Sequence, residues 1–248
     1  MRQLVLGLRM TIAVVILTVF CTAGIVAVLL GMRREKALRM VLPTWARLNL
    51  IACSLDVQIL RGAEHLDAHR PCIYIANHQG LLDAFVFPTL LDKPMFYPIK
   101  KEMVYIPFIG WFAWMTRQPR IDRSDHFQAM LAMEKSTELL RNGLCTLLFP
   151  EGTRSRDGKL GSFKKGAFRM SMDTGVPLIP ITLIDCGDHL PMGTYHLTPG
   201  TIHVVVDPPI YTTDWNRRNL AQKMEEVRNR LLANITEERA KLGLPPTD

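Results

Sequence analysis

A long run of uncharged residues near the N-terminus sets the first limit on how this chain folds. Between Met10 and Met32 there is no acidic or basic side chain, and most residues are aliphatic. A helix needs about 20 apolar residues to cross the hydrocarbon core of a bilayer, so this run is long enough. The small residues from Cys21 to Gly24 resemble the cleavage site of a secretory signal peptide, although such peptides have a shorter apolar region. We expect a membrane-anchoring helix, with a cleaved signal peptide as the alternative.

The charges around this run predict which side of the membrane the rest of the chain faces. Most of the flanking basic residues come after it: Arg33, Arg34, Lys36 and Arg39. Because positive charge collects on the cytoplasmic side, we expect the bulk of the chain at the cytoplasmic face of the cell membrane. Residues 38–48 mix apolar side chains with arginine and tryptophan, which fits either an interfacial amphipathic helix or a helix packed on the domain core. We assign residues 1–54 to membrane-anchoring helices and residues 55–248 to one folded domain.

Composition limits the kinds of partner and site. The net charge of +7 favours anionic partners, such as nucleic acid, anionic lipid, phosphorylated metabolites or an acidic carrier protein, without choosing among them. The five cysteines form no CxxC pair and their number is odd. A zinc site or a disulfide framework is therefore not expected, and a reducing compartment fits best.

Beyond residue 55, short apolar runs alternate with helical patterns. We predict strands over residues 72–76, 144–149, 178–184 and 201–206, and a helix near residues 125–142 that ends at Asn142-Gly143. A second helix is expected after Ser162. The C-terminal stretch has apolar residues at helical spacing: Leu220, Met224, Val227, Leu231 and Ile235. This alternation predicts an α/β fold with a mixed, mostly parallel sheet flanked by helices, in which ligands gather at the carboxyl ends of the strands.

A histidine and an aspartate follow the first predicted strand, in the sequence NHQGLLD at residues 77–83. His78 and Asp83 are five positions apart, and five steps along a helix turn about 500°, so a single helix would place them on different faces. We therefore expect His78 in the loop and Asp83 in the helix that follows. The aspartate can then bind one imidazole nitrogen and leave the other free as a base. Such a short motif is weak evidence by itself.

A second polar loop, with the sequence FPEGTRS at residues 149–155, follows another predicted strand. Gly152 lets backbone amides approach a ligand closely, and Thr153 and Arg154 supply a hydroxyl and a guanidinium that favour phosphate. Glu151 is unusual beside a phosphate unless it orients Arg154 or binds an acceptor hydroxyl. Some of the scattered basic residues are also expected to serve the ligand: Lys100, Lys101, Arg117, Arg120, Arg123, Lys164 and Lys165.

Residues 81–87 and 104–114 are rich in apolar and aromatic side chains. Such stretches usually belong to the hydrophobic core. In a chain with a membrane anchor they also suit a groove for an acyl chain or a surface in contact with the bilayer.

Taken together, these blocks resemble the 1-acyl-sn-glycerol-3-phosphate acyltransferase family, also called the lysophosphatidate acyltransferases. The likeness runs over residues 70–185, with a similar membrane anchor before it. Four blocks occur in the family's order: NHxxxxD at residues 77–83, an arginine block at 121–123, FPEGTRS at 149–155 and VPLIPI at 176–181. The resemblance implies that residues 55–248 form the catalytic domain.

The resemblance also implies roles for individual residues. His78 would take the proton of the sn-2 hydroxyl of lysophosphatidic acid, and Asp83 would orient it. The glycerol phosphate would be bound by Arg123, Glu151, Gly152, Thr153 and Arg154, with Lys100 and Lys101 as further candidates. The donor would be acyl-CoA or acyl carrier protein, the product phosphatidic acid for phospholipid biosynthesis, and no metal or cofactor is expected. The chain has no GxSxG elbow and no cysteine in a plausible nucleophile setting, which favours direct attack without an acyl-enzyme.

Other functions stay open at this stage. The acceptor could be glycerol 3-phosphate or another lyso-lipid. In a lipid or thioester hydrolase, water would replace the acceptor, although a phosphate-binding loop would then be superfluous. A module without catalytic activity that docks on anionic membranes fits the basic charge. Nucleic acid is not expected as a partner, because the chain carries no recognition motif for it.

Overall fold

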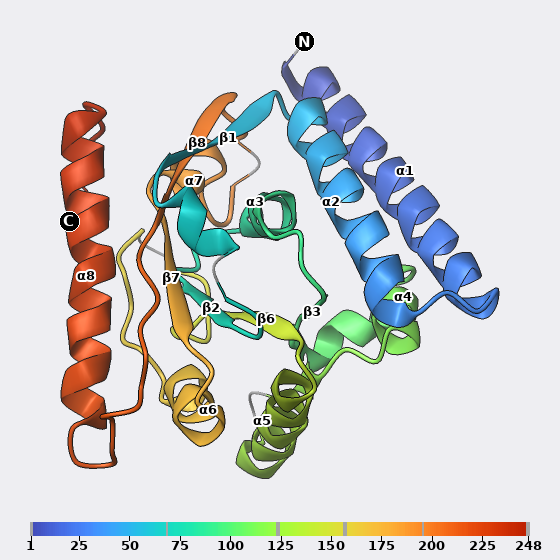
Figure 1. Ribbon diagram of the computed structural model, residues 1–248. Coiled ribbons are helices and arrows are strands. Elements are labelled where there is room, and N and C mark those ends of the chain that lie inside the picture. The colour runs from blue at the N-terminus through green and yellow to red at the C-terminus, as the bar shows by residue number, and fades with distance from the viewer. Residues whose placement is uncertain (1, 68, 123–124, 156–157, 195, 247–248) are drawn as a thin grey trace.

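The computed structural model describes residues 2–67, 69–122, 125–155, 158–194 and 196–246. Two long helices open the chain, α1 (Arg2–Leu29) and α2 (Arg34–Ala52), and they form an antiparallel hairpin at one side of the molecule (Figure 1). Helices and strands then alternate: β1 (Leu55–Arg61), η1 (Ala63–Leu66), β2 (Ile73–Ala76), α3 (Asp83–Leu90), β3 (Met95–Phe96), β4 (Ile99–Lys100), η2 (Lys101–Tyr105), α4 (Ile109–Met115), β5 (Arg120–Ile121), α5 (His126–Arg141), β6 (Cys145–Leu148), α6 (Gly166–Thr174), β7 (Leu178–Leu183), α7 (Cys186–His189), β8 (Gly200–Val206) and α8 (Leu220–Lys241).

Six strands form the main sheet, in the order β1-β8-β7-β2-β6-β3. All neighbours are parallel except β7 and β8, so the predicted mixed, mostly parallel sheet is confirmed. The four predicted strands correspond to β2, β6, β7 and β8. Because β3, β6, β2 and β7 run the same way, the loops that follow them meet at one edge of the sheet.

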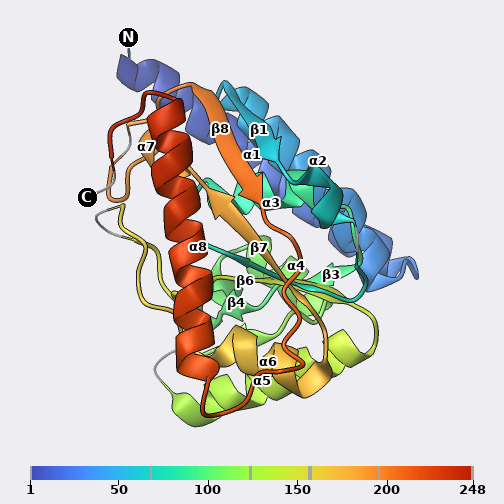
Figure 2. The same ribbon diagram turned by 60° about the vertical axis from the view of Figure 1, so that its left-hand side comes forward.

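Helices cover both faces of this sheet, and the pleat divides its side chains between them. On β2, Tyr74 and Ala76 pack in a core with α3, whereas Ile73 and Ile75 pack in a core with α5, α6 and α8. Figure 2 brings α8 to the front, where it runs along the sheet. The apolar residues that predict α8 are all buried, which confirms that helix: Leu220, Met224, Val227, Leu231 and Ile235.

The hairpin packs on the rest of the chain through α2. Helix α2 lies between α1 and α3 (Figure 1), and the Trp45 ring on α2 lies 4.9 Å from the Phe85 ring on α3. Its buried residues include Leu38 and Val41, whereas Met40 and Ile51 are exposed. Residues 38–48 therefore form a helix packed on the domain, one of the two alternatives above. The domain division at residue 54 stays a prediction, although it falls between α2 and β1.

Helix α1 has the character of a membrane segment. Within the described residues, one helical stretch, Thr11–Leu29, is long and apolar enough to cross a membrane, and little of it is buried. Helix α1 contacts α4 through Phe112, which packs in a small cluster with Cys21, Leu38 and Val41. The hairpin and α4 thus form one apolar unit beside the sheet.

Four strands lie outside the predicted set. In strand β1 the polar residues Asp56, Gln58 and Arg61 are exposed and interrupt the apolar ones, so the strand lacks a long apolar run. It forms the outer edge of the sheet, where one side needs no partner. Strands β3, β4 and β5 have two residues each, too few for a periodic pattern to be seen.

Candidate active site

The two polar loops predicted to carry the chemistry meet at the carboxyl edge of the sheet. His78 lies in the loop after β2, and residues 149–155 follow β6, the parallel neighbour of β2. Two hydrogen bonds join the loops directly. The backbone amide of His78 donates to Glu151 Oε1 at 2.8 Å, and the amide of Ser155 donates to the His78 carbonyl at 2.9 Å. Parallel pairing therefore brings together two motifs that lie about 70 residues apart.

The His78 imidazole is held by Asp83, the first residue of α3. Nδ1 lies 2.5 Å from Asp83 Oδ2, and this same oxygen accepts the amides of Gln79 at 2.9 Å and Gly80 at 3.0 Å. A carboxylate at the start of a helix is also favoured by the helix dipole. Because an ionised carboxylate only accepts hydrogen bonds, Nδ1 carries the proton and Nε2 is left as the basic nitrogen. The predicted relation of loop histidine and helix aspartate is confirmed.

Aromatic rings fix the imidazole plane. The Phe149 ring stacks on His78 with centroids 4.0 Å apart and planes 16° apart, and Phe87 meets Phe149 edge-on at 5.5 Å. The His78 side chain is 18% exposed, whereas Asp83 is almost fully buried. The imidazole thus has one face covered and its carboxylate partner shielded, while part of the ring remains accessible.

Glu151 serves as a bridge between backbone segments. Its Oε1 accepts the His78 amide, and its Oε2 accepts the amide of Gly161 at 2.9 Å. Burial raises the pKa of Glu151 above its ordinary value, although the two amide donors oppose this shift. We found no ion pair between Glu151 and Arg154 in the described part of the chain. The alternative in which Glu151 orients Arg154 therefore has no support, and its contact with substrate stays a prediction.

The rest of the second loop is more open. Gly152 has a φ of +72°, a left-handed backbone conformation that favours glycine, and the flexible end of the Lys164 side chain lies close to the position that a Cβ would take. Thr153 and Arg154 are exposed. Within the described residues, no hydrogen bond or ion pair engages the Arg154 guanidinium. Loop 149–155 thus presents a cation and a hydroxyl to solvent beside His78.

Lys100 lies in a separate small sheet, and Lys101 begins η2 directly after it. Strand β4 pairs with β5, which places Lys100 opposite Ile121. Lys100 Nζ lies 3.5 Å from Glu102 at the surface, and Lys101 Nζ binds Asp122 at 2.6 Å. Arg123 lies outside the described residues. A role for Lys100, Lys101 and Arg123 in binding phosphate stays a prediction.

Three residues contribute to the site without having been predicted. Asn77 exchanges two hydrogen bonds with the backbone of Leu183, and Gln79 donates to the Leu183 carbonyl at 3.2 Å. The thiol of Cys186 donates to the remaining oxygen of Asp83, with Sγ and Oδ1 3.2 Å apart. Asn77 and Gln79 belong to the motif but had no assigned role. No pattern in the sequence indicated a role for Cys186, because only the packing of β7 beside β2 brings this residue to Asp83.

Comparison with known proteins agrees with this geometry. The family model described as "Acyltransferase" matches residues 58–184. The chain is 33% identical to 1-acyl-sn-glycerol-3-phosphate acyltransferase BAT2, chloroplastic, of Brassica napus, over 87% of this chain and 64% of that protein. It is 30% identical to the 1-acyl-sn-glycerol-3-phosphate acyltransferase of Pseudomonas aeruginosa, over 74% of this chain and 72% of that protein. The chain thus spans less than two thirds of the length of the plant protein.

A solved structure shows the same fold over nearly the whole chain. The crystal structure of the 1-acyl-sn-glycerophosphate (LPA) acyltransferase PlsC from Thermotoga maritima superposes with a TM-score of 0.79 at 28% sequence identity. The match covers 96% of each chain. The helical hairpin, the sheet and the edge that carries His78 are therefore parts of one shared architecture.

Proposed function

This chain belongs to the acyltransferase family, and on that premise we propose that it is a 1-acylglycerol-3-phosphate O-acyltransferase. It transfers a fatty acyl group from an acyl thioester to the sn-2 hydroxyl of 1-acyl-sn-glycerol 3-phosphate, giving phosphatidic acid. The observation that carries this proposal is the His78–Asp83 pair, 2.5 Å apart at the carboxyl edge of the sheet and hydrogen-bonded through Glu151 to the FPEGTRS loop. The names of the relatives supply the acceptor.

The first step is proton transfer from the acceptor hydroxyl to His78. Nδ1 is engaged with Asp83, so Nε2 is the nitrogen that takes the proton while the hydroxyl oxygen attacks the thioester carbonyl. Asp83 stabilises the imidazolium that forms. The tetrahedral intermediate then collapses, the C–S bond breaks, and the imidazolium returns its proton to the thiolate. General-base assistance of this kind is worth about 10² to 10⁴ in rate.

Direct attack is favoured over a covalent acyl-enzyme. Cys186 is the thiol that contacts the pair, and it is 1% exposed. Burial and the charge of Asp83 raise its pKa well above the ordinary value, so the thiol stays protonated. A buried thiol in this state is a poor nucleophile and out of reach of a lipid substrate.

The oxyanion of the tetrahedral intermediate needs donors other than the first amides of the His78 loop. The amide of His78 donates to Glu151, and those of Gln79 and Gly80 donate to Asp83. These three groups shape the loop and orient the base. We assign stabilisation of the oxyanion to groups outside this set.

The phosphate of the acceptor is bound from the second loop. Arg154 is exposed and has no protein partner in the described residues, and Thr153 lies next to it, so both are open to a ligand. Gly152 supplies the positive φ of the turn in this loop, and Glu151 joins the loop to His78 through a hydrogen bond. Arg123, Lys100 and Lys101 are further candidates for the phosphate of the acceptor or of the donor.

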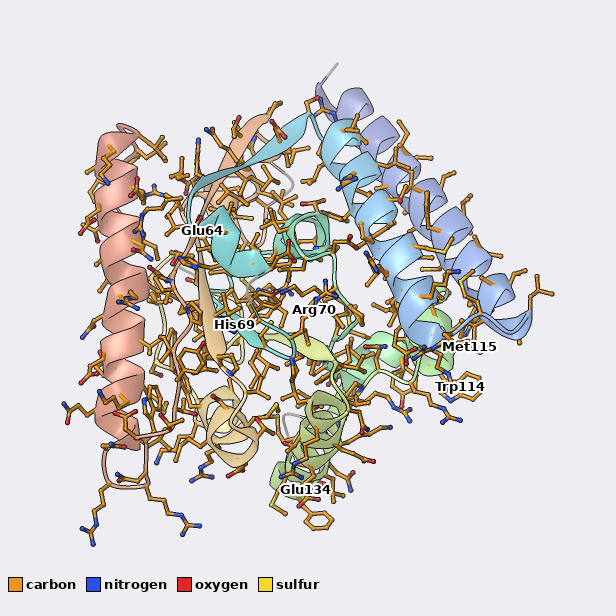
Figure 3. All side chains as sticks on the ribbon, viewed as in Figure 1. Glu64, His69, Arg70, Trp114, Met115 and Glu134 are labelled. Atoms are coloured by element: carbon orange, nitrogen blue, oxygen red, sulfur yellow. The ribbon has the colours of Figure 1, made fainter. Side chains whose placement is uncertain are left out.

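The η2–α4 segment carries the side chains that suit contact with a bilayer. On the η2–α4 segment, Trp111 is 55%, Trp114 64% and Tyr105 82% exposed, and Figure 3 shows Trp114 pointing away from the ribbon. The same helix packs on α1 through Phe112. Tryptophan and tyrosine are enriched where a membrane meets water. We assign α1 and the outer face of α4 to the cytoplasmic leaflet, where lysophosphatidic acid is available.

The test is an acyl-transfer assay with products separated. Purified protein in phospholipid vesicles is given lysophosphatidic acid with labelled acyl-CoA, or with labelled acyl carrier protein, in parallel with His78→Ala. Labelled phosphatidic acid from the wild type only is the expected result, and the better of the two donors identifies the thioester. Labelled free fatty acid instead would identify a hydrolase. Product only with glycerol 3-phosphate or another lyso-lipid would change the acceptor. Excess chelator is expected to leave the activity intact.

A further inference from the structure

The catalytic aspartate rests on a corner of the fold that no motif includes. This corner, Leu183–Asp188, is the segment where β7 ends and α7 begins. Asp83 uses its two oxygens differently. Oδ2 accepts from His78 and from two loop amides, whereas the donor to Oδ1 is the Cys186 thiol at 3.2 Å. Among the described residues, the Cys186 thiol is therefore the donor that satisfies the second oxygen of this fully buried carboxylate.

The same corner binds the histidine loop on either side of His78. The Asn77 side chain donates to the Leu183 carbonyl at 2.9 Å and accepts the Leu183 amide at 2.8 Å. The Gln79 side chain accepts the amide of Gly187 at 2.9 Å. Loop and corner thus dock through paired polar contacts that are largely buried, and Cys186 lies between Leu183 and Gly187.

The corner is itself anchored from behind. Asp185 accepts the His203 amide at 2.8 Å and binds its Nδ1 at 2.5 Å, which ties the corner to β8. Arg239 of α8 donates to the Ile184 carbonyl at 3.1 Å and to Asp188 at 2.8 Å. Cys186 is consequently held from two sides by elements that take no part in the proposed chemistry.

We propose that Cys186 is a positioning residue, which acts by donating its thiol hydrogen to Asp83 Oδ1 and so fixes the carboxylate that orients His78. This inference rests on the proposed function. Without the donor, Oδ1 would be a buried, charged oxygen with an unmet hydrogen bond, a costly state that is relieved by rotation of the side chain. A rotated Asp83 no longer holds the imidazole in its productive orientation.

Cys186→Ala and Cys186→Ser test the proposal because they differ by a single oxygen. Cys186→Ala removes the donor, and we expect kcat to fall about tenfold with KM changed less than about twofold, as for an interaction that matters in the transition state. Cys186→Ser keeps a donor on a shorter bond, and we expect it to recover most of the lost kcat. Cys145→Ala is the matched control, since Cys145 is an equally buried thiol on β6. That variant is expected to lose stability but keep its kcat.

The outcomes separate a positioning role from core packing. If Cys186→Ala keeps wild-type kcat, or if the Ala and Ser variants lose kcat equally, the proposal is wrong. A proportional loss of kcat and thermal stability in Cys145→Ala would also contradict it, because any buried thiol would then have the same effect.

A spectroscopic measurement keeps this test independent of the substrate. The Nδ1 proton of His78 gives a downfield NMR resonance when a carboxylate holds it, and its absence in His78→Ala distinguishes it from that of His203, which also lies against a carboxylate. We expect that resonance to be sharp in the wild type and the Ser variant, and to broaden through faster exchange with water in Cys186→Ala. An unchanged resonance in Cys186→Ala would overturn the proposal. If the wild type acylates no acceptor, the proposed function fails while this readout still decides the role of Cys186.

Discussion

Two histidine–aspartate pairs in this chain share one geometry and differ in their surroundings. In both pairs, Nδ1 lies 2.5 Å from a carboxylate oxygen, and the same aspartate also accepts a backbone amide. The imidazoles are 18% and 17% exposed, and the carboxylates are 1% and 4% exposed. Neither distance nor burial therefore distinguishes His78–Asp83 from His203–Asp185.

The difference lies in the backbone that carries each histidine. His78 is in a loop, stacked on Phe149, with Glu151 joining it to the FPEGTRS residues. His203 is in β8, opposite Gln58 of β1, and its carbonyl accepts the Ile184 amide. A hydrogen-bonded strand fixes a histidine as part of the scaffold, whereas a loop beside the exposed Arg154 guanidinium can present one to a substrate. The pair geometry alone is not sufficient evidence of catalysis.

The largest expected contrast is between the two histidines. His78→Ala removes the proposed base, and we expect kcat to fall by about 10²-fold or more. His203→Ala removes only an anchor of the corner that supports Asp83, and we expect a loss of about threefold or less together with a lower melting temperature. The acyl-transfer assay and thermal unfolding measure the two quantities. Equal losses of kcat in the two variants would remove the distinction.

The aspartates sharpen the same contrast. In the wild type, Asp83 Oδ2 accepts hydrogen bonds from His78 Nδ1 and from the amides of Gln79 and Gly80. Asp83→Asn can place an NH2 group there, which cannot accept a hydrogen bond and therefore disfavours the tautomer with the proton on Nδ1. We expect a loss of kcat of about 10²-fold. Asp185→Asn is expected to lower mainly the stability of the fold. Initial rates at saturating lysophosphatidic acid measure kcat of both variants. A fully active Asp83→Asn enzyme would exclude the orienting role.

The arginines near each pair are expected to affect different quantities. Arg154 has no protein partner in the described residues, so Arg154→Ala is expected to raise KM for lysophosphatidic acid about tenfold with little change in melting temperature. Arg239 is bonded to Ile184 and Asp188, so Arg239→Ala is expected to lower the melting temperature instead. Arg154→Lys, which keeps the charge, is the control. Saturation curves with an unchanged KM in Arg154→Ala would place the phosphate elsewhere.

The smallest expected effect concerns the bridge beside His78. Burial raises the folded-state pKa of Glu151 above its ordinary value of 4.5. The folded chain then holds this proton more tightly than the unfolded chain, so the stabilisation is present below pH 4.5 and is lost as the pH rises through the folded pKa. Glu151→Gln does not titrate. The stability of the wild type relative to this variant should therefore fall as the pH rises from below 4.5 toward neutrality.

Thermal unfolding of both proteins across that range measures this difference. Glu151→Gln also replaces one accepting oxygen with a donor. This change lowers the stability of the variant at every pH and does not alter how the stability difference depends on pH. A stability difference between the two proteins that is constant with pH would show that burial does not raise the pKa of Glu151.

Much of the fold could be predicted because its signals are local. Strands β2, β6, β7 and β8 are apolar runs bounded by polar loops, and α8 has a regular apolar stripe. The edge strand β1 was not predicted, because the predicted strands are continuous apolar runs, whereas in β1 Leu55, Val57 and Ile59 alternate with polar residues, as in a strand with one exposed face. His78 and Asp83 could be paired from spacing alone, since loop and helix follow each other directly in the chain.

The contacts made by Glu151 and Cys186 could not be predicted in the same way. Glu151 appeared as a ligand-binding group in a polar loop, but it bridges amides that are 73 and 10 residues away. The Cys186 thiol reaches Asp83 across 103 residues. Nothing in the local sequence of either residue carries information about such partners.

By itself, the sequence predicted an apolar N-terminal helix long enough to cross a membrane, the alternating α/β plan and the contact of His78 with Asp83, because each depends on residues that are near neighbours in the chain. Only the tertiary structure decided that a second His–Asp pair forms between His203 and Asp185, that Glu151 joins the two polar loops, and that the Cys186 thiol donates to Asp83. These outcomes depend on strand order, which places the ends of β2, β6 and β7 side by side. Strand order is set by the burial of the whole core and is not encoded in any single segment.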